Sequence, residues 1–317
     1  MTVKLGVIMD PINAIHYKKD STMAMLWEAQ KRGWLIYYME QKDVFMKNGD
    51  VYANVRVLQV YKDPDSWYEF KNQECIALEK LNVILMRKDP PVDLEYIYTT
   101  YLLEFVEHRG VLVVNKPQSL RDANEKLFTT WFSTCCPLTL VTSNIQLLRD
   151  FLTEQQDIIC KPLNAMGGAS IFRLQFPDEN ASVVFEMLTH YGKSAIVAQR
   201  YIAEVKHGDK RILLINGEPI PYALARIPAP GELRGNLAAG GHGIAQPLTG
   251  QDHKICQQVG PVLRQKGLFF VGLDVIGDFL TEINVTSPTC IRELDEQCEL
   301  NIAETFMNFI EHSLRLS

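Results

Sequence analysis

The sequence predicts an α/β protein in which an open α/β layer is followed by a second, more β-rich part. The chain has 317 residues, which is enough for two or three domains with large cores. Short apolar runs alternate with helix-like periods through its first third. A Gly- and Pro-rich segment at 227–243 interrupts the last third, and loops of this length are usually lids or linkers.

The first third of the chain accounts for the open α/β layer. Asp20–Ser21 can cap a helix that runs through Lys31 and stops at Gly33. Residues 93–108 have helical spacing and end at Gly110. Four apolar runs around these helices predict strands at 3–9, 35–39, 83–86 and 111–114. Strands and helices in this order are typical of an open α/β layer.

The remaining two thirds predict shorter elements that surround two Gly-rich segments. Helices are expected at 144–153, 181–191, 251–266 and 296–315. Strands are expected at 138–141, 158–161, 171–174, 196–201, 211–215 and 220–226, and a hairpin at 271–285. The sequence contains no internal repeat, so a solenoid is not predicted.

Composition and charge exclude several classes of function. The formal net charge is −6, which argues against non-specific binding to nucleic acid or to anionic membranes. No run approaches the ~18 apolar residues of a membrane span, and the first residues read as a strand rather than a signal peptide. The seven cysteines are scattered and show no Cys-x-x-Cys spacing. We therefore expect a cytoplasmic protein with free thiols and with no nucleic-acid or membrane partner.

Acidic and amide side chains interrupt the last predicted hairpin. Glu282 and Asn284 are two residues apart on a strand and therefore share a face. A two-residue loop alone would place Asp274 opposite Thr281. A three-residue loop or a bulge would instead place it opposite Glu282, and we predict this second arrangement. Each acid alone is more often a solvated strand residue, but the set within apolar sequence favours a site for a hard cation such as Mg²⁺.

A Gly-rich turn follows the strand predicted at 158–161. Lys161 ends this strand, and the small residues at 167–170 would let main-chain N–H groups approach an anion closely. The order differs from a Walker A loop and from the dinucleotide-binding fingerprint, because the glycines lie between two predicted strands. Alone, a Gly-Gly pair is usually only a turn, whereas above a nucleotide it would form a flap on the phosphates.

Basic residues in apolar or turn contexts complete the candidate site. They are Lys126, Lys161, Arg211, Arg226 and Arg234. Each alone is more often a surface residue, but together with the acidic hairpin they supply what a nucleoside triphosphate requires. The segment at 196–202 could read an adenine edge through its main chain, although an ordinary core strand explains it equally well. A serine hydrolase has no support, because the sequence contains no Gly-x-Ser-x-Gly elbow.

Six segments together resemble the bacterial glutathione synthetase family of ATP-grasp ligases. They are MRKDPP at 86–91, NKPQSLRDANEKLF at 115–128, KPLNAMGGASIFR at 161–173, GDKRILLINGEPIPYALARIP at 208–228, RGNLAAGGHG at 234–243 and GLDVIGDFLTEINVTSPTCIRE at 272–293. The resemblance spans almost the whole chain. Two positions depart from the family's pattern: Ala165 replaces a glycine of the flap, and His242 stands where the loop often carries arginine.

The resemblance implies an N-terminal substrate domain and a two-part ATP-grasp module with a Gly-rich lid loop. The implied domains are residues 1–125, the central lid domain 126–203 and the catalytic domain 204–317. The residues implied to bind ATP are Lys126, Lys161, Met166, Gly167, Gly168, Ala169, Ser170, Gln199, Tyr201, Ile202, Asp209 and Lys210. The implied metal ligands are Asp274, Glu282 and Asn284. The residues implied to face the reacting acyl phosphate are Arg211, Arg226, Arg234 and Asn236, and those implied to bind the peptide substrate are Arg87, Ser287, Thr289 and Arg292.

The resemblance also implies an activity. The chain would be an ATP-dependent ligase that joins γ-glutamylcysteine to glycine through an acyl phosphate and releases ADP and phosphate, with no need for an enzyme nucleophile. The implied cofactor is Mg²⁺, with Mn²⁺ as an alternative, and the implied assembly is a homotetramer. Two other interpretations stay open. One is a different carboxylate–amine ligase, of the D-alanine–D-alanine or glutamate-adding type, and the other is a non-catalytic regulator that binds ATP on the same fold.

Overall fold

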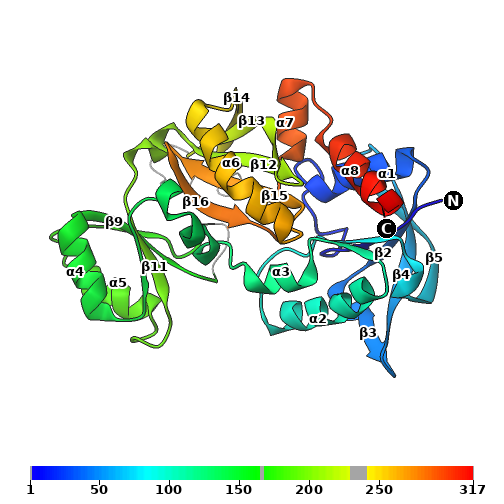
Figure 1. Ribbon diagram of the computed structural model, residues 1–317, viewed down its shortest axis with the longest axis horizontal. Helices are drawn as coiled ribbons and strands as arrows, with labels where there is room; N and C mark the ends of the chain where they lie inside the picture. Colours follow the sequence, from blue (N-terminus) through cyan, green and yellow to red (C-terminus); the bar gives the residue numbers. More distant parts are fainter. Residues whose placement is uncertain (1, 165–167, 229–240, 317) are drawn as a thin grey trace.

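Three β-sheets in a row organise the molecule, as the computed structural model in Figure 1 shows. The structure describes residues 2–164, 168–228 and 241–316. Along the chain, a seven-stranded sheet comes first, a four-stranded sheet second and a five-stranded sheet last. In Figure 1 the five-stranded sheet lies between the other two, and both chain ends lie beside the seven-stranded sheet. Within the described ranges, no helix has the length and apolar character needed to cross a membrane.

The seven-stranded sheet has the α/β character predicted for the first third of the chain. Its strands β2, β1, β6 and β7 run parallel, an arrangement that requires crossover connections. Their bounds are Lys4–Ile8 for β1, Leu35–Met39 for β2, Val83–Met86 for β6 and Leu112–Val114 for β7. Helix α1, Ser21–Lys31, and helix α2, Leu94–His108, make two of the crossovers. The predicted cap of the first helix is confirmed, because the Asp20 carboxylate accepts from the main-chain N–H of Met23 at 2.7 Å.

An antiparallel extension of this sheet lies between residues 40 and 82, where no element is predicted. It consists of β3 Val44–Lys47, β4 Asp50–Val60 and β5 Tyr68–Ala77. Strand β4 pairs with β2, and both β3 and β5 pair with β4. The signal in the sequence is the alternation of Val51, Ala53 and Val55, which are buried while the residues between them are not.

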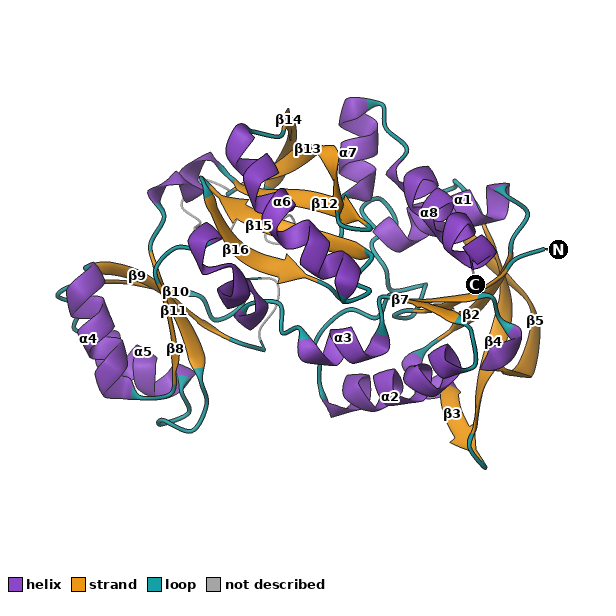
Figure 2. Ribbon diagram, viewed as in Figure 1, coloured by secondary structure: helices purple, strands orange, loops and turns teal. Residues whose placement is uncertain are grey.

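The four-stranded sheet forms a small body with a core of its own. Its antiparallel strands follow the order β10-β9-β11-β8. Their bounds are Thr139–Thr142 for β8, Asp157–Pro162 for β9, Phe172–Gln175 for β10 and Ile196–Arg200 for β11. Helices α4, Ile145–Gln155, and α5, Ala181–Leu188, cover one face (Figure 2). Ten buried residues drawn from these strands and helices form a core that is separate from the rest of the molecule.

The five-stranded sheet is antiparallel throughout, in the order β14-β13-β12-β15-β16. The bounds are Asp209–Ile215 for β12, Glu218–Ile227 for β13, His242–Pro247 for β14, Phe270–Ile276 for β15 and Phe279–Asn284 for β16. Helix α6, Gly250–Gln265, packs on one face (Figure 2). This contact is close: a Cβ atom at Gly217 would lie 2.4 Å from the carbonyl oxygen of Gly260. The opposite face packs in part against α7 and α8, through Leu213 and Ile215 of β12, and its remaining part carries the charged side chains described below.

The C-terminal region contains two helices instead of the single helix predicted at 296–315. They are α7 Ile291–Cys298 and α8 Ile302–Leu316. Glu299 separates them, because its left-handed conformation (φ 53°) ends α7. Helix α8 packs against α1, and two hydrophobic cores each contain residues of both the seven-stranded and the five-stranded sheets. These two sheets are therefore packed together, whereas the four-stranded sheet relies on its own core.

Candidate active site

The hairpin β15–β16 aligns its acidic side chains as the sequence predicts. Asp274 pairs with Glu282 across the two strands, and Gly272 pairs with Asn284. The loop has two residues, and the register shifts beside the first pair because Thr281 is an extra residue in β16. Such a β-bulge is the arrangement that was predicted to bring the acids together. Asp274, Glu282 and Asn284 consequently lie on one face of the sheet.

Asp274 is buried and is held by arginines from two other strands. Arg211 of β12 is its cross-strand neighbour and donates from Nε to Oδ1 at 2.5 Å and from Nη2 to Oδ2 at 3.0 Å. Nη2 of Arg226 on β13 lies 2.9 Å from Oδ2. Desolvation alone would raise the pKa of Asp274, but the two guanidinium groups outweigh it and hold the pKa well below its usual range. The structure therefore holds this carboxylate charged and fixed in direction.

Asp209 begins β12 and shares Arg226 with Asp274. Nη2 of Arg226 lies 2.5 Å from Asp209 Oδ2, so one guanidinium bridges two carboxylates. The other oxygen of Asp209, Oδ1, is buried and has no hydrogen-bond partner among the described residues. Burial raises the pKa of Asp209 to about 6 against the opposing charge of Arg226. A buried acceptor of this kind is satisfied when a ligand donates a hydrogen bond to it.

Gly272 gives Arg211 the space to lie across this face. A Cβ atom at position 272 would lie 2.8 Å from Arg211 Cδ and 3.0 Å from Pro288 Cβ. Glycine inside a strand often marks a close approach of this sort. Any side chain at this position would displace the arginine that holds Asp274.

Two lysines from outside the five-stranded sheet complete the charged face. Lys126 immediately precedes the 3₁₀ helix η3, Leu127–Cys135, and its Nζ lies 2.8 Å from Glu282 Oε1. Lys161 lies on β9 of the four-stranded sheet, and its Nζ donates to the carbonyl oxygen of the bulged residue Thr281 at 3.4 Å. Both lysine side chains are buried. Desolvation lowers the pKa of Lys161, although the nearby carboxylate of Glu282 acts in the opposite direction.

Among the described residues, the charged face gathers four cations and three carboxylates. The cations are Lys126, Lys161, Arg211 and Arg226, and the carboxylates are Asp209, Asp274 and Glu282. The carboxylate of Glu125 lies near Glu282 as well. Four buried cations brought to one place suit an anionic ligand, and a doubly or triply charged ligand would bring a counter-ion with it.

The predicted adenine-binding segment follows β11 at the edge of the four-stranded sheet. Gln199 is buried on β11, and its Nε2 donates to Thr139 Oγ1 at 3.1 Å. The guanidinium carbon of Arg173 lies 3.6 Å from the centre of the Tyr201 ring. Ile202 is buried next to it in sequence. The segment therefore combines an oriented amide with apolar surface, which suits a flat heteroaromatic ring.

The predicted flap and lid are described only in part. Gly168, Ala169 and Ser170 lie in a turn, in which Gly168 and Ser170 have φ values of 78° and 56°. Met166, Gly167, Arg234 and Asn236 lie outside the described residues, as does Ala165. His242, the other position that departs from the family's pattern, begins β14.

Lys210, which the resemblance also implies in ATP binding, makes its side-chain contact on the other face of the sheet. Side chains alternate along β12, so Lys210 points away from the face that carries Asp209 and Arg211. Its Nζ lies 2.5 Å from Oδ1 of Asp252, which is fully buried on α6. Lys210 thus ties the sheet to the helix that covers its opposite face.

Two of the predicted substrate-binding residues lie where the loop after β16 meets the seven-stranded sheet. Arg87 is buried directly after β6 and donates from Nη2 to the carbonyl oxygen of Pro288 at 3.0 Å and from Nε to Thr22 Oγ1 at 3.1 Å. The hydroxyl of Ser287 donates to the carboxylate of Asp89. Burial lowers the pKa of Arg87. These contacts join the first and third sheets beside the charged face.

The other two predicted substrate-binding residues follow in sequence, Thr289 in the same loop and Arg292 in the first turn of α7. The side chain of Thr289 contacts Cys290, with 3.8 Å between Oγ1 and Sγ. Arg292 donates from Nη1 to the carbonyl oxygen of Tyr17 at 2.8 Å, and its guanidinium carbon lies 4.6 Å from the centre of the Trp27 ring. The Arg292 side chain therefore faces the loop before α1 in the first domain.

The residue before Lys126, Glu125, also reaches this face and is not among the predicted site residues. The Glu125 carboxylate accepts hydrogen bonds from residues directly after Asn284. A signal could have come from its position, because Glu125 is next to a predicted phosphate-binding lysine in a segment between two domains. A glutamate beside a lysine is nevertheless too common on surfaces to be selected without the structure.

The oxygen donors on β16 fit a hard divalent cation. Asn284 donates from its amide nitrogen to the carbonyl oxygen of Gly272 at 3.2 Å, which turns its amide oxygen away from the strand pair. Glu282 is part exposed beside it on the same face. No group of three or more His, Cys, Asp or Glu side chains suited to a metal occurs in the described ranges. A cation here would therefore combine Glu282 and Asn284 with oxygens of its anionic partner, the mode that Mg²⁺ uses with nucleotides.

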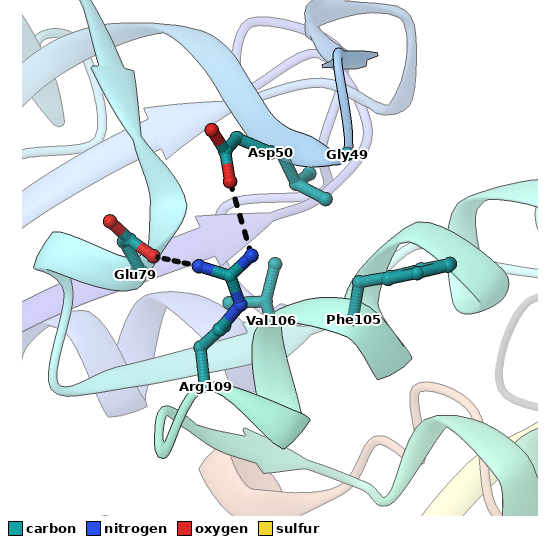
Figure 3. A pocket seen from close by; sticks show the side chains of 7 residues that line it. Gly49, Asp50, Glu79, Phe105, Val106 and Arg109 are labelled. Atoms are coloured by element: carbon teal, nitrogen blue, oxygen red, sulfur yellow. Dashed lines mark hydrogen bonds and ion pairs between the residues drawn. The ribbon is translucent and has the colours of Figure 1, made fainter.

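A shallow pocket elsewhere has no comparable chemistry. Figure 3 shows it between the β3–β4 turn and the end of α2, lined by Gly49, Asp50, Val51, Glu79, Phe105, Val106 and Arg109. Arg109 is paired with both Asp50, at 3.2 Å, and Glu79, at 3.0 Å. All three of these side chains are about half exposed, so the pairs are screened by solvent. We assign no catalytic role to this pocket.

Comparison with known proteins identifies the family of the whole chain. The family model for the prokaryotic glutathione synthetase N-terminal domain matches residues 3–121, and that for the prokaryotic glutathione synthetase ATP-grasp domain matches residues 125–299. The glutathione synthetase of Pseudomonas syringae pv. tomato is 58% identical over 315 residues, covering 99% of each chain. That of Vibrio vulnificus strain YJ016 is 55% identical over 315 residues, also covering 99% of each chain.

Solved structures of lower sequence identity share the fold. The D-cycloserine synthetase DcsG has a TM-score of 0.67 at 16% identity, with 97% of this chain and 99% of that chain covered. The ATP-grasp ligase PsnB, solved with a minimal precursor, Mg and ADP, has a TM-score of 0.63 at 15% identity, with 98% of both chains covered. The ATP-grasp fold predicted from the sequence is therefore confirmed. From the relatives and the two family matches together, the chain belongs to the prokaryotic glutathione synthetase family, ATP-grasp ligases that use ATP and a divalent metal ion to make glutathione.

Proposed function

We propose that the chain makes glutathione by activating the C-terminal carboxylate of γ-glutamylcysteine on the charged face of the five-stranded sheet. One observation carries the proposal. Arg211, Arg226 and Asp274 form a fixed charged cluster there, and a lysine from each of two other parts of the chain reaches the same face. Such a preorganised set of cations suits phosphoryl transfer, which depends mainly on positioning and on neutralising charge.

The nucleotide would lie between the four-stranded and five-stranded sheets. We assign its phosphates to Lys126 and Lys161, with Gly168, Ala169 and Ser170 of the flap above them. We assign its base to Gln199, Tyr201 and Ile202. Asp209 supplies a buried acceptor for a hydrogen-bond donor of the nucleotide or of the peptide. Met166, Gly167, Arg234 and Asn236 remain assigned by resemblance to the flap and to the lid over the acyl phosphate.

The reaction proceeds in two displacements that need no enzyme nucleophile. A carboxylate oxygen of the peptide attacks the γ-phosphorus of ATP, the bond to the bridging oxygen breaks, and ADP leaves with that electron pair. The neutral amine of glycine then attacks the acyl carbon, the carbon–oxygen bond to phosphate breaks, and the amine loses one proton to give the amide. Arg211 and Arg226 are placed to stabilise the charge on the phosphoryl and acyl oxygens.

Water must be kept from the acyl phosphate during these steps. The part of the chain that would cover it is the Gly-rich segment at 227–243, whose assignment as a lid rests on its length and composition. The separate core of the four-stranded sheet is compatible with movement of that sheet relative to the other two.

The metal is proposed to be Mg²⁺, with Mn²⁺ as the alternative, held by Asp274, Glu282 and Asn284. When bound, the ion would neutralise phosphate charge and hold the triphosphate in one orientation. Arg211 and Arg226 meanwhile hold Asp274 in place on the adjacent strand. The oxygen-only donor set supports a hard cation over a thiophilic one.

The decisive experiment measures phosphate release with each substrate omitted in turn. With ATP, Mg²⁺, γ-glutamylcysteine and glycine present, we expect phosphate and glutathione in equal amounts. We expect little phosphate release when either the peptide or glycine is left out. Release with D-alanine alone would support a D-alanine–D-alanine ligase instead, and ATP binding without any release would support a regulator.

We also propose that the chain acts in the cytoplasm as a homo-oligomer, with a tetramer suggested by the family resemblance. All seven cysteines lie within the described residues and are free thiols, which is typical of a reducing compartment. A stripe on α2 supports self-association: Leu94, Tyr98, Tyr101 and Phe105 are 67, 52, 49 and 53% exposed. Their spacing of four, three and four residues makes a helix-pairing seam. The mass measured by light scattering distinguishes a tetramer from a dimer or a monomer.

A further inference from the structure

Glu125 makes an unusual set of contacts with the strand that carries two proposed metal ligands. It lies in the connection between α3, Pro117–Asp122, and η3. Its Oε1 accepts hydrogen bonds from the main-chain N–H of Val285 at 2.9 Å and from the N–H and the hydroxyl of Thr286 at 3.1 and 2.9 Å. Its carbonyl oxygen accepts from the N–H of Ile283 at 2.9 Å. One residue thus binds the chain on both sides of Asn284.

These bonds complete an otherwise open edge of the sheet. Strand β16 is the last strand of the five-stranded sheet and pairs on one side with β15. Along its other side, the outward N–H groups of Ile283 and Val285 would lack strand partners. The carbonyl and the carboxylate of Glu125 meet them in turn, so that Glu125 replaces a short neighbouring strand. This fixes the direction of the main chain at Asn284, and hence the direction of its side chain.

The next residue, Lys126, contacts Glu282, the other proposed metal ligand on β16. Lys126 Nζ lies 2.8 Å from Glu282 Oε1. The dipeptide Glu125–Lys126 therefore restrains β16 at two alternate residues, the first through the main chain beside Asn284 and the second through the side chain of Glu282. Ligands of a metal site bind well only when their surroundings hold them in the required direction.

We propose that Glu125 is a positioning residue that holds Glu282 and Asn284 in the geometry required to bind the divalent metal with ATP. The proposal rests on the proposed function, because it takes these two residues as the metal ligands. The role is one of hydrogen-bond acceptance. Glutamine has the same length and keeps an acceptor oxygen, so it can perform the role, whereas alanine cannot.

The experiment uses three variants of the full-length protein. Glu125→Ala removes the acceptor, and Glu125→Gln keeps it. The control is Asp295→Ala, because Asp295 Oδ1 on α7 also accepts a main-chain hydrogen bond, from the N–H of Ile302 at the start of α8, at 2.9 Å. Metal binding is measured without turnover, as the loss of the free Mn²⁺ electron-paramagnetic-resonance signal in the presence of a non-hydrolysable ATP analogue. The Mg²⁺ concentration for half-maximal activity is measured in parallel.

We expect Glu125→Ala to weaken Mn²⁺ binding about tenfold, the range found when a residue that orients metal ligands is removed. Its half-maximal Mg²⁺ concentration should rise by a similar factor, and an excess of Mg²⁺ should restore most of the rate. Glu125→Gln should stay within about twofold of the wild type in both measurements. Asp295→Ala should lower the thermal midpoint without changing metal binding.

Three outcomes would overturn the proposal. Glu125→Ala could bind Mn²⁺ as the wild type does, Glu125→Gln could be as defective as Glu125→Ala, or Asp295→Ala could weaken metal binding equally. If Glu125→Ala fails to fold, the comparison between Glu125→Gln and wild type, together with a Glu125→Asp variant whose shorter side chain should weaken binding, still decides the question. If the wild type itself binds no metal with the nucleotide, the proposed function is at fault rather than the role of Glu125.

Discussion

The two sheets that border the proposed nucleotide site are built on different physical principles. The five-stranded sheet shares its hydrophobic cores with the seven-stranded sheet, and its face opposite α6 carries a network of paired buried charges. The four-stranded sheet has its own core of ten residues, and the face it turns toward the site carries Lys161 and Gln199. The five-stranded sheet thus holds its charges by mutual pairing. The four-stranded sheet instead presents Lys161, whose hydrogen bond within the described residues is a 3.4 Å contact to a carbonyl oxygen.

This difference indicates which functional residues also stabilise the fold. A buried charge that is paired becomes a large cost when its partner is removed. A buried charge that is weakly contacted is a cost while it remains, and its removal relieves the protein. Substitutions of the charged residues in the five-stranded sheet should therefore lower both activity and stability. Substitutions of the site residues in the four-stranded sheet should lower activity without lowering stability.

The largest effect is expected for Asp274→Asn. The substitution keeps the shape but removes the charge that Arg211 and Arg226 share, so two buried guanidinium groups lose their common partner. We expect the free energy of unfolding to fall by about 3 kcal/mol or more, together with loss of activity. Urea denaturation at neutral pH measures the first and glutathione formation the second. A variant as stable as the wild type would remove the basis of the comparison.

The difference in stability between the wild type and Asp274→Asn should depend on pH. The pKa of Asp274 is lowered in the folded state, so its contribution to stability is fully present above the unfolded pKa, near 3.8, and is lost as the pH falls toward the folded pKa. The stability difference between wild type and Asp274→Asn should therefore be constant above about pH 5. Below pH 3.8 it should shrink by about 1.4 kcal/mol per pH unit. A difference that grows with acidity would contradict the sign of the shift.

Lys161→Met should act in the opposite sense on stability. Burial lowers the pKa of Lys161, so replacing its ammonium group with an apolar side chain of similar length removes an unfavourable buried charge. We expect unchanged or higher stability, with the KM for ATP raised about 30-fold by the loss of about 2 kcal/mol of charged hydrogen bonding to phosphate. Thermal unfolding and steady-state kinetics measure the two effects.

Lys210→Met is the matched control for that substitution. Lys210 is an equally buried lysine of the same region, but it pairs with Asp252 on the opposite face. Its replacement should lower stability, because Asp252 stays buried, while the KM for ATP changes little. A large rise in the KM for ATP would restore Lys210 to the nucleotide site and contradict the separation of the two faces.

Local pattern was enough to predict much of the fold and part of the site. The apolar runs gave β2 and β6 with their observed bounds. The spacing of Asp274, Glu282 and Asn284 called for either a three-residue loop or a bulge, and the structure has the bulge. The position of Lys210 was also implied by the alternation of side chains along a strand. The resemblance alone placed Lys210 among the ATP-binding residues, and its contact with Asp252 of α6 is a long-range one that local pattern does not give.

Long-range pairing accounts for what could not be predicted. The arginines that hold Asp274 come from β12 and β13, and their contact depends on the order of strands in the sheet, which no local pattern encodes. The contacts of Glu125 with Val285 and Thr286 span about 160 residues for the same reason. Strands β3 to β5 are different, because the alternation of Val51, Ala53 and Val55 along β4 is a local pattern that indicates a strand.

The smallest effect is expected for Gln199→Leu in the four-stranded sheet. Gln199 is uncharged, and its amide is oriented by Thr139, so leucine removes one neutral hydrogen bond to the proposed base and leaves the core on the other face of the sheet unchanged. A neutral hydrogen bond contributes about 1 kcal/mol, which corresponds to a KM for ATP about fivefold higher. Stability should change little, and the preference for ATP over GTP should narrow, because that preference depends on the edge of the base. If Gln199→Leu instead destabilised the protein as strongly as Asp274→Asn, the two sheets would not differ in the way proposed. The face of the four-stranded sheet that carries Lys161 and Gln199 would then belong to the same stabilising network as the charges of the five-stranded sheet.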